Sequence, residues 1–336
     1  EIVRAGLHRI GVELKVVPMA RAGLNPLEDL RTLSFLFREF QSLKFDTVIP
    51  YTMKPIIYAG IAARMAGIRH RCFLVTGLGH VFSADGAASR KGKIVRAVSV
   101  QLYRAAFSGA HVVFAYNDAD SEDLKRHSML RDNDLIQLVP GSGVDLEHYE
   151  AAPVPRGKPV FLLIARLLGD KGIREYVGAA RIVKSHFPEA TFQLLGHFDP
   201  NPTAISPQEV KSWTEEATID YVGVTRDVRP FLADCSVFVL PSYYREGIPR
   251  SILEALSTGR AVITTDMPGC NETVIPGVNG YLVPPKSVEA LADAMLEFCR
   301  SPSLGVIMGR NSRALAERKF DVHHVNLMLL SRMGLT

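Results

Sequence analysis

Apolar residues recur along the chain with two different spacings. Short apolar runs bounded by glycine, proline or polar residues are typical of buried strands, whereas apolar residues at every third or fourth position predict amphipathic helices. The predicted strands are residues 12–17, 47–49, 71–76, 111–114, 135–139, 160–165, 191–195, 219–222, 237–240, 261–264 and 280–283. The predicted helices are residues 1–10 (the end of a helix), 26–43, 54–66, 92–107, 118–127, 172–186, 207–216, 228–233, 250–257, 288–300, 304–319 and 322–333.

The alternation of strands and helices favours an α/β fold with mostly parallel sheets and helices on both faces. Residues 140–158, which are dense in proline and glycine, predict a linker. The 336 residues exceed a typical single core, so we expect two Rossmann-like, doubly wound domains that face a cleft. The expected domains are residues 1–146 and 147–320, with a helix at 321–336 that packs back on the first. We also expect that an N-terminal strand and its loop are missing before residue 1.

The composition is that of a soluble globular protein, with 47% apolar and 22% charged residues. The net charge of +4 is unevenly distributed, because residues 1–110 carry 16 basic and 7 acidic side chains and the remainder carries 23 and 28. This asymmetry is consistent with chance variation, but it also suggests an acidic surface or substrate that faces the first half.

Compartment and membrane topology can also be predicted from the sequence. No run approaches the roughly 18 apolar residues of a membrane-spanning helix, and we expect no signal peptide. The four cysteines are far apart and lack metal or redox spacing, so we expect reduced, mostly buried thiols in a cytosolic protein. They are Cys72, Cys235, Cys270 and Cys299.

The most informative stretch runs from the predicted strand at 237–240 into the predicted helix at 250–257. A loop between a strand and a helix N-terminus presents free amide groups to an anion such as phosphate. Glu246 and Glu254 bracket this loop, and two carboxylates would repel a phosphate. They fit a ligand that also carries hydroxyl groups, because a carboxylate accepts two hydrogen bonds from a vicinal diol. A ligand with phosphate between two hydroxyl-bearing sugars is a nucleotide sugar, so this stretch suggests a nucleotide-sugar site.

A second strand–helix junction contains Arg166, Gly169, Lys171 and Gly172. An arginine fork and a lysine point charge suit a diphosphate. The same residues also suit an ordinary solvated turn. Because the loop at 247–250 follows a strand that we expect in the same sheet, we favour a phosphate site over an ordinary turn.

These motifs resemble the retaining family-4 (group 1) glycosyltransferases of GT-B fold. The likeness rests on Glu246-x7-Glu254, on Arg166 with Lys171-Gly172, and on residues 140–145, 266–274 and 277–284. It covers residues 140–300 strongly and the first half more loosely. Residues 76–82 resemble the bacterial subset that extends polyprenyl-diphosphate-linked oligosaccharides or capsule repeats.

The resemblance implies an acceptor-binding first domain and a donor-binding second domain. It implies that Arg166 and Lys171 hold the donor diphosphate, and that Glu254 holds the ribose. Glu246 and the backbone of Gly247, Ile248, Pro249 and Arg250 would hold the transferred sugar, while Val224 and Thr225 would contact the base. His80 would approach the sugar, although it equally suits a loop histidine with a local hydrogen bond.

The implied reaction is transfer of a hexose or N-acetylhexosamine, with retention, from a UDP-sugar to a lipid-linked glycan. We expect neither a metal nor another cofactor, because a helix N-terminus and two cations can stabilise the leaving nucleotide. The expected partners are the nucleotide sugar, a polyprenyl-diphosphate glycan and a membrane surface, with no nucleic acid. The expected location is cytoplasmic and peripheral, at the inner face of the cell membrane.

The basic segment at 89–104 has no acidic residue. Its default interpretation is a helix that faces the core through Ile94, Val95, Val98, Leu102 and Ala105. A second interpretation is contact of its basic side chains with anionic lipid or a lipid diphosphate, and we favour a combination of the two. The basic residues in question are Arg90, Lys91, Lys93 and Arg96.

Two other functions stay open at this point. One is a nucleotide-sugar epimerase with the same architecture, which needs acid and base groups at the sugar carbon that we do not find. The other is a non-catalytic nucleotide-sugar-binding protein, which the missing N-terminal strand and loop would permit.

Overall fold

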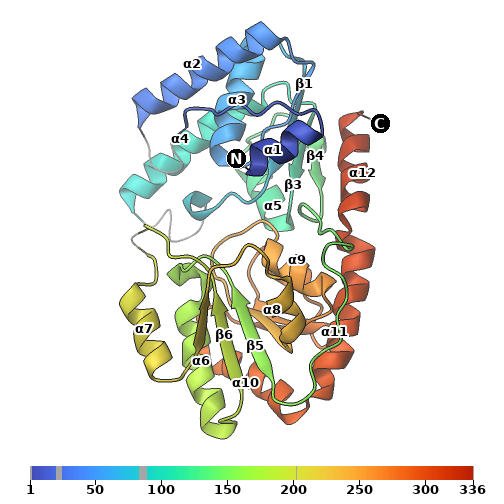
Figure 1. Cartoon of the computed structure of the whole chain (residues 1–336). Helices are drawn as coiled ribbons and strands as arrows, with labels where there is room; N and C mark the ends of the chain where they lie inside the picture. Colours follow the sequence, from blue (N-terminus) through green and yellow to red (C-terminus); the bar gives the residue numbers. More distant parts are fainter. Residues whose placement is uncertain (1, 20–24, 83–88, 202, 336) are drawn as a thin grey trace. The chain divides into compact units, whose positions relative to one another are not determined.

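The computed structural model describes residues 2–19, 25–82, 89–201 and 203–335 (Figure 1). The chain forms two units. The first comprises residues 1–75, 97–114 and 124–136, and the second comprises residues 76–96, 115–123 and 137–336. The described residues 76–82, 89–96 and 115–123 therefore belong to the second unit. The predicted boundary at residue 146 stays a prediction.

A sheet with strand order β1-β2-β3-β4 is formed in the first half of the chain, and β1 pairs in parallel with β2. Its strands are β1 (Thr47–Val48), β2 (His70–Val75), β3 (Val112–Ala115) and β4 (Ile136–Leu138). The helices of this half are α1 (Ile2–Arg9), α2 (Pro26–Leu43), α3 (Met53–Met65), α4 (Arg90–Phe107) and α5 (Asp118–Arg126). The strand predicted at 12–17 is wrong, because this stretch is irregular and leaves Val12 and Val16 exposed. An alternating pattern forms a strand only where a neighbouring strand accepts its hydrogen bonds.

Within the described residues, six strands form the second sheet, in the order β10-β9-β8-β5-β6-β7, with every pair parallel. The strands are β5 (Val160–Ile164), β6 (Thr191–Leu195), β7 (Asp220–Gly223), β8 (Val237–Leu240), β9 (Ala261–Thr265) and β10 (Gly280–Val283). The strand order reverses between β5 and β8. Loops that follow strands on either side of such a switch point diverge and leave room for a ligand.

Helices cover both faces of this second sheet (Figure 1). They are α6 (Ile173–His186), α7 (Pro207–Glu215), α8 (Arg229–Asp234), α9 (Arg250–Ser257), α10 (Val288–Arg300) and α11 (Ser303–Leu315). Buried apolar residues of α6, α7 and α10 pack on one face, and those of α8 and α9 pack on the other. The predicted doubly wound α/β architecture is thus confirmed for this sheet. The chain ends with a π-helical turn, η6 (Ala316–Phe320), and α12 (Val322–Met333).

Helix α4 forms where predicted, but its buried face is not the predicted one. Ile94 and Val98 are 58% and 51% exposed. The buried residues of the helix are Ser99, Val100, Tyr103, Ala106 and Phe107. The aromatic pair Tyr103 and Phe107, with ring centroids 5.3 Å apart, supplies more apolar area than Ile94 and Val98 and therefore determines which face is buried.

Candidate functional site

The strand–loop–helix that dominates the sequence forms as predicted. All four residues of β8 are buried, and the following loop leads to Pro249, which precedes α9 in an extended conformation. The loop is anchored to the turn after β5, because the amides of Tyr243 and Tyr244 donate to the Asp170 carbonyl over 2.9 and 3.1 Å. The switch point between β5 and β8 thus joins the two predicted motifs.

Lys171 and Glu246 form an ion pair at this junction, with Nζ and Oε1 2.5 Å apart. The Ser242 hydroxyl donates to the same Glu246 oxygen over 2.7 Å. Lys171 ends a single 3-10 turn and is followed by Gly172, whose φ is +74°. A Cβ at Gly172 would lie 2.1 Å from the Pro241 carbonyl oxygen, so only glycine allows the turn to approach the end of β8 this closely.

Arg166 pairs with Asp199, with Nη1 and Oδ2 3.1 Å apart, and its side chain is 39% exposed. The sequence predicted Arg166 but not its partner, because Asp199 lies in the loop after the next strand, β6. The guanidinium is therefore held by one carboxylate and still reaches solvent.

Glu254 is buried on the first turns of α9. It accepts hydrogen bonds from Arg250 Nε, at 3.2 Å, and from the Tyr149 hydroxyl. Burial raises the pKa of Glu254, and the bonds from Tyr149 and Arg250 oppose that increase. Burial, followed by the nearby Glu254 carboxylate, raises the pKa of Tyr149 to about 12. Sequence reasoning missed Tyr149, which lies in the linker and carries no motif.

A cavity of about 360 Å³ brings these groups together. Its predicted lining residues are Arg166, Lys171, Val224, Thr225, Glu246, Pro249, Arg250 and Glu254. The sequence did not identify His197 and Ser251, which also line it. Three cationic side chains, two carboxylates and the N-terminus of α9 therefore share one small cavity, which suits a ligand with both phosphates and hydroxyls.

Two predicted donor residues, Gly247 and Ile248, do not line this cavity. Gly247 lies where a Cβ would be 2.4 Å from the Thr76 carbonyl oxygen. A Cβ on Gly269 would be 1.6 Å from the Gly247 carbonyl oxygen, and a Cβ on Gly141 would be 2.8 Å from Ile248 Cβ. The loop is thus packed tightly between three other segments, which fixes the position of Glu246.

The remaining predicted residues lie elsewhere. His80 begins a 3-10 turn, and its side chain lies outside the described residues. Arg90, Lys91 and Lys93 are exposed on α4. Arg96 is half-buried, because its Nε donates to the Val81 carbonyl over 2.9 Å and its guanidinium lies 5.9 Å from the Phe82 ring centroid.

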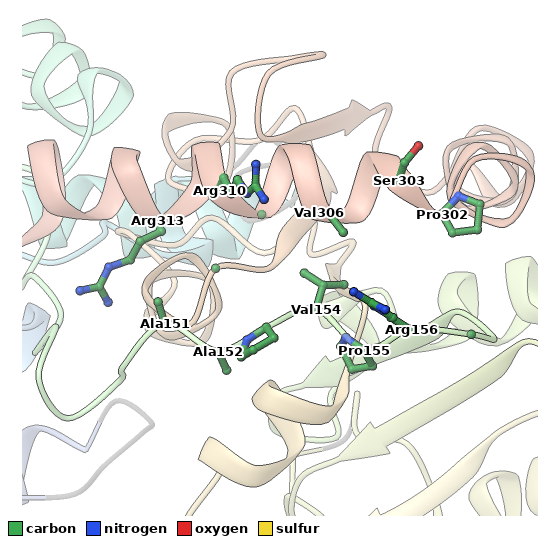
Figure 2. A pocket seen from close by; sticks show the side chains of 14 residues that line it. Ala151, Ala152, Val154, Pro155, Arg156, Pro302, Ser303, Val306, Arg310 and Arg313 are labelled. Carbon is green, nitrogen blue, oxygen red and sulfur yellow. The ribbon is translucent and has the colours of Figure 1, made fainter.

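Larger cavities occur away from these groups. One of about 700 Å³ lies between residues 151–157 and α11, where Val154 points toward the helix (Figure 2). Its lining is mostly apolar and contains no carboxylate among the described residues. Another, of about 460 Å³, is lined by Glu272, Arg318, Lys319 and His324. Neither contains the strand–loop–helix, so volume alone does not identify the site.

Part of the chain matches a known family, and most of the chain resembles two characterised relatives. Residues 158–301 match the family described as "Glycosyl transferases group 1". The N,N'-diacetylbacillosaminyl-diphospho-undecaprenol alpha-1,3-N-acetylgalactosaminyltransferase of Campylobacter jejuni is 28% identical, over 91% of this chain and 81% of the relative. The UDP-Gal:alpha-D-GlcNAc-diphosphoundecaprenol alpha-1,3-galactosyltransferase of Escherichia coli is 26% identical, over 91% of this chain and 79% of the relative.

Solved structures share the fold. The Anabaena protein Alr3699/HepE, crystallised with UDP, matches with a TM-score of 0.78 and 19% identity, over 100% of this chain and 90% of that chain. Sucrose-phosphate synthase from Thermosynechococcus elongatus matches with a TM-score of 0.74 and 21% identity, over 95% of this chain and 81% of that chain. The predicted GT-B fold is confirmed.

Proposed function

Since this chain is a glycosyltransferase of GT-B fold whose residues 158–301 match the group 1 family, we propose that it moves a hexose or N-acetylhexosamine from a UDP-sugar to a glycan on a polyprenyl diphosphate. The observation that carries the proposal is the cavity that Arg166, Lys171, Glu246 and Glu254 share. The C. jejuni and E. coli relatives, whose names specify undecaprenol-linked acceptors, support this class of acceptor.

Arg166 and Lys171 bind the diphosphate in this proposal. Each is held in place by a carboxylate, Asp199 for Arg166 and Glu246 for Lys171. An incoming diphosphate offers a stronger, doubly charged acceptor and draws both cations toward it. Glu246 is then free to accept hydrogen bonds from the transferred sugar.

Glu254 accepts the ribose hydroxyls, because its buried carboxylate lies on the wall of the cavity and a carboxylate suits a vicinal diol. Val224 and Thr225, in the loop after β7, line the same cavity and contact the base. Tyr149 and Arg250 orient Glu254 through the hydrogen bonds described above.

The reaction proceeds with retention in this proposal. The bond between sugar C1 and the phosphate oxygen breaks, and a bond between C1 and the acceptor oxygen forms on the same face. The acceptor hydroxyl proton passes to the leaving phosphate, and UDP departs. Arg166, Lys171 and the N-terminus of α9 stabilise the charge that develops on the phosphate. These groups supply the stabilisation without a cofactor.

The acceptor lies in a membrane, and the exposed side of α4 suits that surface. Ile94 and Val98 are exposed beside Arg90, Lys91 and Lys93. Apolar side chains among basic ones favour an anionic membrane interface. No helix in the described part of the chain has the length and apolar character needed to cross a bilayer. We therefore propose peripheral attachment at the cytoplasmic face of the cell membrane.

The test is a UDP-release assay with a panel of UDP-, GDP- and ADP-sugars and a purified lipid-linked acceptor. We expect release of UDP that depends on the acceptor and is lost in Lys171→Met. Lys211→Met, which alters an exposed lysine paired with Glu215, serves as the matched control and should retain activity. An epimerised UDP-sugar without acceptor, or binding without any turnover, would reject the proposal.

A further inference from the structure

Arg245, the residue before Glu246, points away from the donor cavity into a buried acidic cluster. Its Nη2 lies 3.1 Å from Asp120 Oδ1, and its Nη1 lies 2.5 Å from Asp123 Oδ2. The same Nη1 donates to the Phe82 carbonyl over 3.2 Å. The side chains of Arg245, Asp120 and Asp123 are 12%, 0% and 8% exposed, so solvent screens these ion pairs little.

The cluster also forms hydrogen bonds with the main chain of two loops, at the Glu246 carbonyl and at the Leu78 amide. Asn117 Nδ2 donates to Asp120 Oδ2 over 2.9 Å and to the Glu246 carbonyl over 3.2 Å. The amide of Leu78 donates to Asp120 Oδ1 over 3.3 Å. Asp120 thus links the segment at 76–82 to the loop that carries Glu246.

Asp120 belongs to an Asp-x-Asp triplet, Asp118-Ala119-Asp120. Such a spacing often indicates a metal site, but both oxygens of Asp120 already accept hydrogen bonds from Arg245, Asn117 and Leu78. Burial raises the pKa of Asp120, and the Arg245 guanidinium opposes that increase. The carboxylate is therefore part of a built ion-pair cluster.

We propose that Arg245 is a positioning residue for sugar transfer. This inference rests on the proposed function. Arg245 does not line the donor cavity, so it acts through Glu246. By pairing with Asp120 and Asp123 it fixes the Glu246 main chain against residues 76–82. The loop that carries Glu246 and the loop that contains His80 thereby keep one relative geometry.

The test compares Arg245→Gln, Arg245→Lys and the control Arg181→Gln, which removes an exposed pair with Glu216. A displacement of about 1 Å at a reacting group lowers turnover roughly 10²-fold, so we expect kcat of Arg245→Gln to fall about that far. The affinity for UDP, measured by calorimetry, should change less than about 3-fold, because Arg166, Lys171 and Glu254 stay in place. Arg245→Lys should restore part of kcat, since it keeps the charge but loses the fork geometry.

Hydrogen exchange provides a readout that does not depend on turnover. In Arg245→Gln, peptides covering 76–82 and 242–250 should exchange faster, whereas a peptide covering α6 should not change. Asp123→Asn removes only one of the two ion pairs of Arg245. It should accelerate exchange in the same peptides and cause a smaller loss of kcat. This variant keeps the test decisive if Arg245→Gln does not fold.

Three results would overturn the inference: an unchanged kcat, a loss of UDP affinity in step with kcat, or unchanged exchange at 76–82 and 242–250. If the unmodified chain transfers no sugar, the proposed function fails, and the exchange experiment still decides whether Arg245 orders the two loops.

Discussion

Replacing Gly247 by alanine tests whether the fixed position of the loop that carries Glu246 matters for turnover. The added Cβ would lie 2.4 Å from the Thr76 carbonyl oxygen and 3.1 Å from Tyr116 Cδ2. Both neighbours are rigid, since one is backbone and the other is the ring of a buried tyrosine. The φ of Gly247 lies outside the left-handed region, so the substitution tests steric contact rather than backbone strain.

The size of the effect follows from the clash. Ordinary Cβ contacts begin at 3.4 Å, so the loop must retreat by about 1 Å from Thr76. Overpacking of this kind costs about 1–3 kcal/mol of stability. A 1 Å displacement at the reacting centre costs about 10²-fold in rate, or about 2.7 kcal/mol of transition-state stabilisation. We therefore expect kcat/KM to fall about 100-fold while the chain stays folded.

The assay is steady-state UDP release, with thermal unfolding measured on the same samples. Gly305→Ala is the matched control, because a Cβ there meets its nearest atoms at 3.7 Å and the position lies inside α11. Alanine is favoured over glycine in helices by up to about 1 kcal/mol, and Gly305 lies in the first turn of α11, so the control should retain activity and melt no earlier. Full activity of Gly247→Ala would refute the claim that the loop position is critical.

Three further predictions concern titration and charge. The affinity for UDP should fall as pH decreases through the raised pKa of Glu254, and calorimetry on Glu254→Gln should find weak binding without that dependence. Lys171→Met should lower kcat/KM at least about 10²-fold with an unchanged circular dichroism spectrum, because it removes the cation that the proposed function assigns to the leaving phosphate. Burial raises the pKa of Glu272 to about 7 from its ordinary 4.5, so the stability contributed by its protonated form is present below pH 4.5 and is lost as pH rises through 7. Denaturant midpoints should show this loss in the unmodified chain and not in Glu272→Gln.

Much of the candidate site could be predicted because it depends on local chain order. Lys171 follows β5 and Glu246 follows β8, and in a parallel sheet the carboxyl ends of neighbouring strands lie at one edge. Gly172 and the helix start at Arg250 were visible as turn and helix signals. These local rules were sufficient to bring both motifs into one cavity.

The partners of these groups could not be predicted in the same way. Asp199 reaches Arg166 across 33 residues of sequence, and Asp120 reaches Arg245 across 125. No spacing rule connects such positions, because the fold alone decides which loops meet. The aspartates at 118, 120 and 123 lie in the predicted helix at 118–127, and nothing in the sequence connects them with Arg245.

The two wrong predictions, the strand at 12–17 and the buried face of α4, have a common cause. The spacing of apolar residues indicates a type of element but not which part of the chain packs against it. Residues 12–17 alternate as a strand would but pair with no strand in the described part of the chain. On α4, the apolar residues Ile94 and Val98 lie on the opposite side of the helix from Val100, Tyr103 and Phe107, and the side with the larger aromatic residues is the one that is buried. Periodicity predicted the helix correctly and its orientation incorrectly.

The central claim is sugar transfer from a UDP-sugar to a lipid-linked acceptor with retention. The most direct measurement incubates the chain with a labelled UDP-sugar and a polyprenyl-diphosphate glycan, extracts the lipid, and determines the anomeric configuration by NMR. We predict that label enters the lipid product in equal amount to the UDP released, with the anomeric configuration of the donor. Label that remains in the aqueous phase as free or epimerised sugar, or a product of inverted configuration, would contradict the account.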